Sequence, residues 1–589
     1  MSKPTSSRRD FLLRSASTVA VVATAGTTLV ACGGSNSPPA DFKYGVASGD
    51  PLADRVILWT HAKVVDSLDA VTLTWQVSAS TAFTNIVASG TVSASSDTGF
   101  TAKVDAAGLT TGNTYYYRFL DRYNISSPIG TTRTLPANNV ASVKFAVFSC
   151  ALLSEGYFNA YDAASKSGAE FAVHLGDYIY EYGADPAKFG NSATPPGRSP
   201  VPTKDIVSLE DYRARYAQYR SDVNLQAAHA AMPWITVWDD HEFANNAWVD
   251  GAENHNSATQ GSWTARKGVA AKAYHEWMPI RTPDASNLLK IYRRFDFGNV
   301  FTLHMLDTRI EGRDRQYDGY GDADGGLSRY GTALATGADA THRMMSTTQQ
   351  NWLTSGTASS TATWQILGNQ DIMSRMWFPA NVLQASGAAI ASPTPANQQG
   401  VQTAITSYLT AKVTRATAGT GALTPAQTAL LNPSTNPLLP YNLDSWDGYP
   451  LQRETILQTI KAQGKKLITL SGDSHNAWFA NVTTLSGERV GFEFAGSSIS
   501  SPGFESAGLG ALASSMDGTA VAPKNGTGFG LVNDLNYVDT IRRGYLLMTA
   551  SNAEIKGEYV FVNTVKSTNY TAVTGKTVTV PTSGVVTYS

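Results

Sequence analysis

Cysteine is nearly absent from this chain, because its 589 residues include only Cys32 and Cys150. A disulfide framework and a zinc ribbon are excluded, since both need more cysteines. An excess of one charge is also lacking: 45 Lys and Arg stand against 47 Asp and Glu, so no electrostatic footprint for nucleic acid exists. Disorder is excluded by 42% apolar and 10% aromatic residues. The length predicts two or more domains, or one large core with additions.

The first cysteine closes a segment typical of exported proteins. Residues 1–32 start basic and continue as a weakly apolar stretch that is too short and too polar for a stable membrane-spanning helix. Arg8-Arg9 before Asp10-Phe11-Leu12 resembles a twin-arginine export signal. Leu29-Val30-Ala31-Cys32 resembles a lipobox, in which the cysteine carries lipid; the alternative is a plain signal with a chance cysteine. Residues 33–41 form a flexible linker, and we expect a periplasmic, membrane-anchored lipoprotein or a secreted protein.

Two regions of different character follow the linker. Residues 42–136 hold short β-rich runs separated by turn signals such as Gly112-Asn113. About seven short strands predict a fibronectin- or immunoglobulin-like β-sandwich. In residues 141–589, apolar runs end in polar residues and are followed by helical stretches, for example Leu209–Ser221 and Trp263–Trp277. That layout predicts an α/β domain with its site at the carboxyl ends of strands.

Two segments of the second region look like insertions. Residues 195–205 form a Pro-rich loop, and residues 384–445 are rich in Ala, Thr, Pro and Asn with little obvious chemistry. We expect the longer insertion to form a lid or a cover over the site. The tail from Gly544 to Ser589 is again strand-like and is expected to extend a sheet.

Metal-ligating residue types stand at four of the strand ends. These are Ser149-Cys150, Gly176-Asp177, Asp239-Asp240-His241-Glu242 and Gly472-Asp473-Ser474-His475. Each block alone has an ordinary reading as a turn, a polar loop or cap, or a small buried cysteine. Four in one chain predict a mixed site of carboxylate, imidazole and thiolate donors, suited to ferric iron with calcium or other divalent ions. Such metals activate water and polarise a phosphoryl oxygen.

The order of these blocks resembles the alkaline phosphatase D family. The resemblance runs from about residue 42 to the C-terminus and is most specific in His174–Gly183 and Asp239–Glu242. That family lies within the calcineurin-like metallophosphoesterases, which have a four-layer αββα core. The resemblance implies an exported alkaline phosphatase and phosphodiesterase that uses Fe³⁺ and Ca²⁺ to hydrolyse phosphate mono- and diesters.

The resemblance also implies ligands for the metals. Asp177 would bridge them, Cys150 and Tyr180 would bind the iron, and Asp240 would take the place of an Asn ligand. Two further residues would complete the metal shell: Asp473 and His475. Against the wider superfamily, imidazoles are replaced here by harder donors, which disfavours a di-zinc site.

Three residues are candidates for contacts with the substrate. His241 would contact the phosphate or protonate the leaving group, by the same resemblance. Asn246 is a weaker candidate for a metal or phosphate contact. Arg309 is a candidate for binding phosphate through its guanidinium fork, with a structural salt bridge as the alternative.

Direct attack by metal-activated hydroxide is the mechanism that we expect. A phospho-enzyme on Ser or Thr is disfavoured because no Gly-x-Ser-x-Gly elbow follows a strand. A different class of function stays open: a surface-anchored binding or structural protein that uses calcium for folding. The β-sandwich and the Ala/Thr-rich insertion would suit such a protein, and assays on phosphate esters separate the two.

Overall fold

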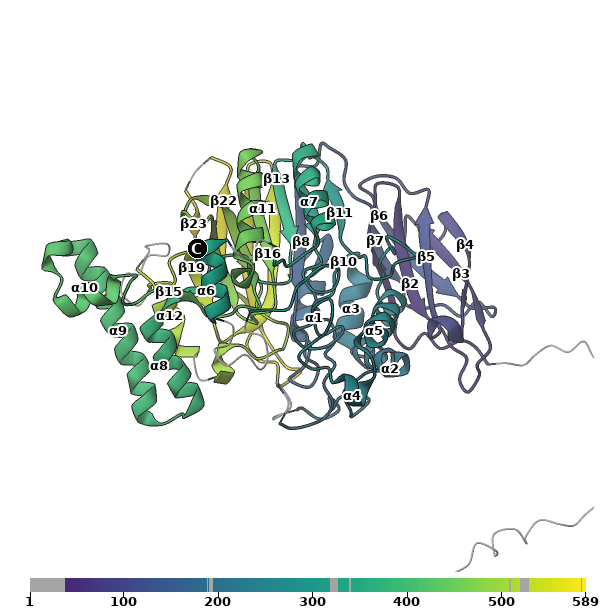
Figure 1. Cartoon of the computed structure of the whole chain (residues 1–589). Helices are drawn as coiled ribbons and strands as arrows, with labels where there is room; N and C mark the ends of the chain where they lie inside the picture. The colour runs from purple at the N-terminus through teal and green to yellow at the C-terminus, as the bar shows by residue number, and fades with distance from the viewer. Residues whose placement is uncertain are drawn as a thin grey trace, which may run out of the picture. The chain divides into compact units, whose positions relative to one another are not determined.

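Two β-sheets packed face to face position the strand ends described above (Figure 1). This computed structural model describes residues 38–187, 189, 194–317, 327–337, 341–507, 510–519, 529–583 and 585–589. Within those residues, one sheet has ten strands in the order β23 (Thr587–Tyr588), β22 (Ala572–Pro581), β21 (Glu554–Val562), β20 (Arg543–Ser551), β8 (Ser142–Phe148), β9 (Phe171–His174), β10 (Trp234–Thr236), β1 (Val46–Gly49), β2 (Arg55–His61) and β5 (Thr101–Ala107).

The second sheet has seven strands within the same residues. Their order is β11 (Arg293–Phe297), β12 (Phe301–Met305), β13 (Trp364–Gly368), β16 (Lys466–Ser471), β18 (Arg489–Ala495), β17 (Ala477–Thr483) and β19 (Leu535–Asp539). The predicted strand-like tail is confirmed, because β20 to β23 form one end of the ten-stranded sheet.

Each sheet has a parallel core of four strands. In the first sheet Val173 of β9 pairs with Val147 of β8 and Ile235 of β10, and β1 joins β10 in the same direction. In the second, β12, β13, β16 and β18 are parallel. These strands are mostly buried, which explains why they read as continuous apolar runs. Parallel strands end at the same edge, so the polar blocks that follow them meet there.

Aromatic side chains fill the space between the two sheets. The rings of Phe145 and Phe301 have centroids 5.4 Å apart, and those of Phe171 and Phe297 lie 5.0 Å apart. Each pair joins one sheet to the other, and burial of one such side chain contributes about 1.5–3 kcal/mol. This shared core fixes the two sets of strand ends relative to each other.

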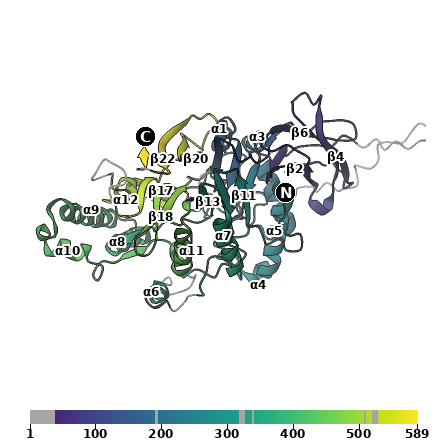
Figure 2. The ribbon, with the colours of Figure 1, turned by 90° about the horizontal axis from the view of Figure 1, so that it is seen from above.

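Helices cover the outer faces of both sheets, giving four layers (Figures 1 and 2). Helices α1 (Asn159–Ser165) and α3 (Val223–Ala231) contact the ten-stranded sheet, and α11 (Pro450–Ala462) packs with α7 (Thr347–Ser359) over the seven-stranded sheet. The two expected helices are confirmed as α2 (Leu209–Arg220) and α5 (Trp263–Trp277). Serine caps start both helices, and a capping box reinforces the start of α2. Shorter helices are α4 (Ser257–Gln260), α6 (Leu327–Thr336) and α12 (Ala513–Met516).

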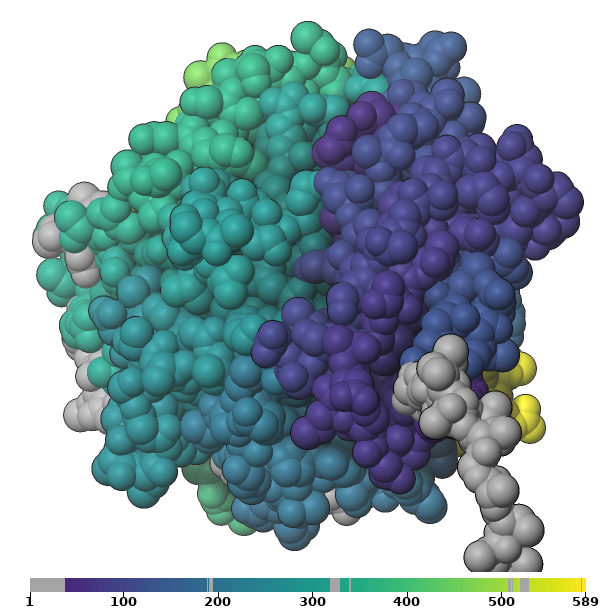
Figure 3. Space-filling model, turned by 90° about the vertical axis from the view of Figure 1, so that its right-hand side faces the viewer, coloured from purple at the N-terminus to yellow at the C-terminus, as the bar shows by residue number. Residues whose placement is uncertain are grey.

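The N-terminal β-region consists of two packed sheets, as expected, but it is not a separate body. A four-stranded sheet runs β4 (Ile86–Ala94), β3 (Val71–Ser78), β6 (Thr114–Leu120) and β7 (Gly130–Arg133). It buries Leu73 and Tyr117 against Val56 and Leu58 of β2. The facing strands β1, β2 and β5 belong to the ten-stranded sheet, because β1 pairs in parallel with β10. Figure 3 shows this purple region lying against the teal part of the chain.

The long insertion forms a helical arm rather than the expected cover over the site. Helices α8 (Ala380–Ala391), α9 (Pro395–Ala418) and α10 (Pro425–Leu431) extend from the body in Figure 1. The paired strands β14 (Trp377–Pro379) and β15 (Leu438–Pro440) form its base. The apolar side chains of α8 and α9 pack beside Trp478 of β17, and this contact holds the arm at the side of the molecule.

The expected leader and lipobox lie outside the described residues, which begin at Pro38. The end of the expected linker is tied down: the backbone N–H of Ala40 donates to Asp121 Oδ2 at 3.0 Å, and Asp41 pairs with Lys63. Among the described residues, no helix combines the length and the apolarity needed to cross a bilayer.

Candidate metal centre

The polar blocks come together at one edge of the two sheets. Cys150 and Asp177 follow β8 and β9, and Asp473 follows β16 of the other sheet. Hydrogen bonds join the loops directly: the N–H of Cys150 donates to Gly176 O at 3.2 Å, and that of Gly472 donates to Gln370 O at 2.8 Å. The geometry therefore follows from the parallel strands and from the contact between the sheets.

Two glycines allow these loops to approach so closely. A Cβ at Gly176 would lie 2.4 Å from both the Cβ and the backbone N of Asp239, and its φ of 108° is one that side chains rarely adopt. A Cβ at Gly472 would lie 2.6 Å from Ser149 Cβ. The glycines before Asp177 and Asp473 are thus required by packing.

One donor cluster combines sulfur, nitrogen and oxygen. Ligand atoms of Cys150, Asp177 and His475 all lie within 4.8 Å of one another. The Tyr180 hydroxyl donates to Asp177 Oδ2 at 2.8 Å and lies 3.2 Å from His475 Nε2. The carbonyl of Pro502, 2.8 Å from His475 Nδ1, makes Nδ1 the donor and leaves Nε2 to face the cluster. Thiolate, phenolate, imidazole and carboxylate together suit iron.

The protonation of this cluster depends on a cation. Burial, and then the Asp177 carboxylate, raise the pKa of the Cys150 thiol well above its ordinary value. The same two causes raise the pKa of the Tyr180 hydroxyl. Without a positive ion, both groups stay protonated, whereas a bound metal deprotonates a coordinating thiol. The donor set therefore fits a metal.

A second cluster shares Asp177 with the first. Ligand atoms of Asp177, Asp240 and His241 lie within 4.8 Å of one another. The buried atoms Asp177 Oδ1 and Asp240 Oδ1 accept no hydrogen bond from the part of the chain that the structure describes. Buried carboxylate oxygens without partners are strongly unfavourable unless a cation is bound. The arrangement suits an oxygen-coordinated ion next to the first, with Asp177 between the two.

His241 is held by a glutamate that the sequence reasoning assigned no role. Its Nδ1 lies 2.6 Å from Glu181 Oε2, and its ring centroid lies 4.1 Å from that of Tyr180. Burial lowers the pKa of His241, but Asp240, Asp177 and Glu181 together raise it well above its ordinary value. Burial raises the pKa of Glu181, and the facing His241 outweighs that effect and lowers it to about 2. The pair is an imidazolium held by a carboxylate.

Glu242 organises the backbone below the ligands. Its carboxylate accepts the N–H groups of Asp177 at 3.0 Å, Tyr178 at 2.5 Å and Asp239 at 2.7 Å. Burial, and next the charge of Asp177, raise the pKa of Glu242 to about 8. Three donated hydrogen bonds from two loops show that Glu242 fixes their spacing and does not face the substrate.

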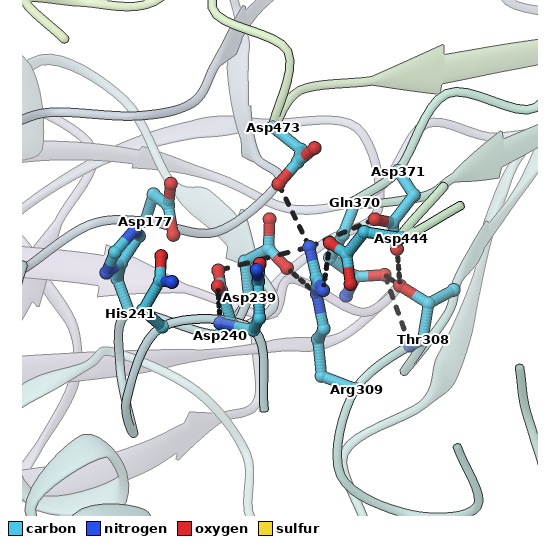
Figure 4. Close-up of polar contacts among 12 residues, drawn as sticks. Asp177, Asp239, Asp240, His241, Thr308, Arg309, Gln370, Asp371, Asp444 and Asp473 are labelled. Atoms are coloured by element: carbon cyan, nitrogen blue, oxygen red, sulfur yellow. Dashed lines mark hydrogen bonds and ion pairs between the residues drawn. The ribbon is translucent and has the colours of Figure 1, made fainter. Parts of the chain in front are cut away.

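Arg309 is surrounded by carboxylates (Figure 4). The fully buried guanidinium bonds to Asp239 at 2.5 Å, Asp371 at 3.0 Å, Asp444 at 2.7 Å and Asp473 at 2.9 Å. The fork considered above for phosphate is thus filled by protein groups. This placement favours the structural salt bridge over a phosphate contact.

Two acids beside Arg309, Asp371 and Asp444, were not predicted from the sequence. Their carboxylates and that of Asp473 lie within 4.8 Å of one another. Arg313 bonds to the Asp444 carboxylate at 2.5 Å and lies 3.4 Å from Asp371. Asp444 belongs to the segment expected to be an insertion without obvious chemistry, and it enters the site just after β15. The end of that insertion is therefore part of the centre.

Asn246 supports a ligand through its backbone. Its N–H donates to Asp240 Oδ2 at 2.5 Å, and its side-chain amide donates to Glu253 at 3.0 Å. The side chain is thus engaged next to the site, and the backbone group is the one that reaches the acidic cluster. This arrangement gives Asn246 a supporting place beside Asp240.

Backbone strain concentrates at these same residues. Among the described residues, ten that are not glycine have positive φ, and five of the ten belong to the site: Cys150 (59°), Asp177 (57°), Asn246 (52°), Asp473 (54°) and His475 (59°). Such conformations are unfavourable and persist where surrounding structure enforces them, often at functional sites. The strain turns each side chain from its strand end toward the common centre.

The electrostatics of the whole cluster call for added positive charge. Burial raises the pKa of Asp239, Asp240 and Asp473, although Arg309 opposes it. Mutual repulsion among these acids adds to the effect. Five buried carboxylates and the partly buried Asp473 face two arginines and the imidazolium of His241; the five are Asp177, Asp239, Asp240, Asp371 and Asp444. Cations with oxygen preference would compensate the excess.

Comparison with known proteins agrees with this geometry. A family model described as PhoD-like phosphatase matches residues 145–559, and one described as its N-terminal domain matches residues 28–136. Alkaline phosphatase D of Bacillus subtilis (strain 168) is 34% identical over 480 residues, which cover 78% of this chain and 70% of that protein.

A solved structure extends the likeness to three dimensions. The structure titled "Structure of PhoD" superposes with a TM-score of 0.71 at 30% identity, over 93% of this chain and 91% of the other. Its coverage includes the N-terminal β-region as well as the site-bearing sheets. The chain therefore belongs to the alkaline phosphatase D family, also described as PhoD-like phosphatases, which hydrolyse phosphoric esters.

Proposed function

We infer that this chain is an exported, metal-dependent phosphatase and phosphodiesterase that hydrolyses phosphate mono- and diesters. One observation carries the metal dependence: Asp177 stands in two adjoining donor clusters and keeps a buried, unpartnered oxygen. The donors of the first cluster suit Fe³⁺ and the oxygens around Asp240 suit Ca²⁺. The family match favours hydrolysis over the alternative of a calcium-stabilised binding protein.

The chain's residues divide the work of holding the metals. The iron would be bound by Cys150, Tyr180 and His475, with Asp177 shared between the ions. Asp240 would bind the oxygen-coordinated ion, and Asp473 would complete the metal shell from the seven-stranded sheet. When bound, the metals supply Lewis acidity that activates water and polarises a phosphoryl oxygen.

His241 would handle the proton of the leaving group. Glu181 engages Nδ1, so Nε2 is the ring atom left for a substrate. The Glu181 carboxylate favours the imidazolium form, which would hold a proton for the departing alcohol oxygen. Arg309 would keep Asp239, Asp371, Asp444 and Asp473 in place and would not touch the phosphate.

Hydrolysis assays test this proposal directly. We expect activity on p-nitrophenyl phosphate and bis-p-nitrophenyl phosphate at alkaline pH with iron and calcium supplied, and its loss in Asp177→Ala and Cys150→Ala. Asp54→Ala, which removes an exposed carboxylate in the β-region, should keep full activity. A wild-type chain inactive on both esters would end the proposal. Retention of configuration at a chiral phosphorus would replace direct attack with a phospho-enzyme.

Export and anchoring need separate experiments. We expect Arg8→Lys together with Arg9→Lys to leave the chain in the cytoplasm, and Cys32→Ala to abolish incorporation of labelled palmitate. A chain exported without the arginine pair, or never labelled on Cys32, would remove the corresponding step.

A further inference from the structure

Exposed apolar side chains gather on two loops of the N-terminal β-region. Val65 is 62% exposed and Leu68 is 76% exposed on the loop before β3; Tyr123 is 45% exposed and Ile125 is 48% exposed on the loop after β6. We call these four residues the entry face. Across the described residues, thirteen large apolar side chains are this exposed, and the entry face and Ile129 supply five of them. Such local concentration marks a contact surface.

The strand register places the two loops side by side. Strands β3 and β6 are antiparallel, with Thr74 opposite Leu120. Residues before Thr74 therefore lie beside residues after Leu120, which brings the loop carrying Leu68 to the loop carrying Tyr123. Residues near the start of the described chain join both loops: Asp41 pairs with Lys63, and Ala40 donates to Asp121.

The Tyr123 loop has a fixed shape. Asp121 Oδ1 accepts the N–H groups of Tyr123 at 2.8 Å and Ile125 at 2.9 Å, and the N–H of Asp121 donates to Ile125 O at 3.1 Å. These bonds close the loop on its own aspartate and hold both apolar side chains outward. A preformed apolar surface loses little conformational entropy on contact.

The position of the entry face on the chain indicates what covers it. The lipobox residue Cys32 precedes Ala40 by eight residues, which span at most about 30 Å when fully extended. A lipid on Cys32 would therefore hold the residues around Ala40 close to a bilayer. A lipid anchor holds the chain at the membrane without setting its orientation, and a nearby apolar contact adds to the attachment.

The charges of the entry face favour apolar contact over electrostatic contact. The two loops and residues 41–43 hold three cationic residues, Lys43, Lys63 and Arg122, and four acidic residues: Asp41, Asp66, Asp69 and Asp121. The Arg122 guanidinium lies 4.8 Å from the Tyr123 ring centroid, a cation and aromatic pair suited to the headgroup level. Because these segments carry no positive excess, we expect little dependence on anionic lipid.

We propose that the entry face rests on a lipid bilayer and inserts Leu68 and Ile125 at its surface as a second attachment point. This contact depends on the proposed lipid anchor, which would bring the entry face close to the bilayer. It does not depend on the proposed phosphatase activity. The contact would fix how the β-region, and the site-bearing sheet continuous with it, stand on the membrane.

Depth-sensitive labels test the contact on the exported full chain. Leu68→Cys and Ile125→Cys would carry an environment-sensitive fluorophore, with Val585→Cys and Val223→Cys as equally exposed controls elsewhere. The parent chain serves as the labelling blank, since Cys150 is fully buried and the Cys32 sulfur would be blocked by its lipid. On vesicles of phosphatidylcholine alone or with phosphatidylglycerol, we expect blue-shifted emission and several-fold quenching by spin-labelled lipid at 68 and 125. The controls should stay aqueous, and the two lipid mixtures should agree within about twofold.

Three results would overturn the proposal. The first is aqueous emission at all four positions, and the second is a chain that vesicles do not retain. The third is a shift at 68 that appears without vesicles and rises with protein concentration, which would make a second copy of the chain the occupant. Phosphatase activity of each labelled chain reports separately on the fold and on the proposed reaction.

Discussion

The two sides of the metal centre solve the problem of buried acids differently. On one side, Asp177 and Asp240 keep oxygens without hydrogen-bond donors in the described chain, and Cys150 and Tyr180 hold protons that burial keeps on them. On the other side, Arg309 and Arg313 form ion pairs with the acids, although Asp239 Oδ2 and Asp371 Oδ1 also accept no hydrogen bond from the described residues. Figure 4 shows Asp177 and His241 at one side and Arg309 with Asp371 and Asp444 at the other. The side around Asp177 can bind added cations, whereas the other side contains the cationic side chains of Arg309 and Arg313.

The largest effect expected on the cation-binding side comes from Asp177→Asn. This change removes the shared ligand and leaves the backbone bonds to Glu242 in place. We expect hydrolysis to fall about a thousandfold, since a metal contributes several kcal/mol to the transition state. Elemental analysis should show the loss of bound metal. Metal content equal to the parent's would contradict the shared position.

The opposite pattern is expected for Arg309→Met on the arginine side. Asp239 and Asp473 lose their arginine partner, and Asp371 and Asp444 keep only Arg313, which lowers the free energy of unfolding by about 3–5 kcal/mol. Denaturant unfolding measures this loss, with Arg55→Met, at an exposed ion pair, as the matched control. If the variant does not fold, Arg309→Lys keeps the charge and should recover much of the stability. An unchanged unfolding midpoint with a large rise in KM would instead make Arg309 a phosphate ligand.

The stability of the metal-free protein should depend on pH through two buried acids near the arginine side. Burial raises to about 6 the pKa of Asp307, two residues before Arg309 in the chain, and that of Asp447. Between about pH 4 and 6 the folded chain keeps protons that the unfolded chain has lost. Stability should therefore fall as pH rises through this window, by at most about 3 kcal/mol for each group.

Unfolding in urea at pH 4.5 and pH 7 measures that change. Asp447→Asn should remove its share of the pH dependence, while Asp66→Asn, on an exposed loop, should leave the curve unchanged. Stability that rises between these two pH values would show that the arginine side already compensates both acids.

The smallest effect is expected for Asn246→Gly. Glycine keeps the positive φ and the backbone N–H that bonds to Asp240, and only the side-chain amide to Glu253 is lost. We expect kcat/KM to stay within about threefold of the parent, because no contact with reacting atoms is removed. A hundredfold loss would place the amide on the substrate or a metal and would extend the cation-binding side.

The sequence predicted the cation-binding side better than the arginine side. Cys150, Asp177 and Asp473 each follow an apolar run, which is a local signal that a reader of sequence can use. Asp444 has no such signal, since it reaches Arg309 only through the pairing of β14 with β15. Glu181 lies inside a recognised run of residues, but its role needs the position of His241, sixty residues later. Local sequence patterns identify strand ends, whereas partners that are distant in sequence can be identified only once the fold is known.

The β-region shows the same limit at the level of domains. Its short strands and turns were predicted from local pattern, and the two packed sheets are present. The parallel pairing of Gly49 with Trp234 has no signature in either segment. A boundary expected near residue 136 is therefore bridged by hydrogen bonds within one sheet.

That bridging pair has a consequence for biosynthesis. The ten-stranded sheet ends at β5 on one side and β23 on the other, so its strands come from both extremes of the chain. The two ends are held through non-local pairs, and such pairs form slowly because long loops must close first. A growing polypeptide cannot finish this sheet until its last residues leave the ribosome. A transport machinery that accepts only folded cargo would thus reject truncated chains without any dedicated proofreading step.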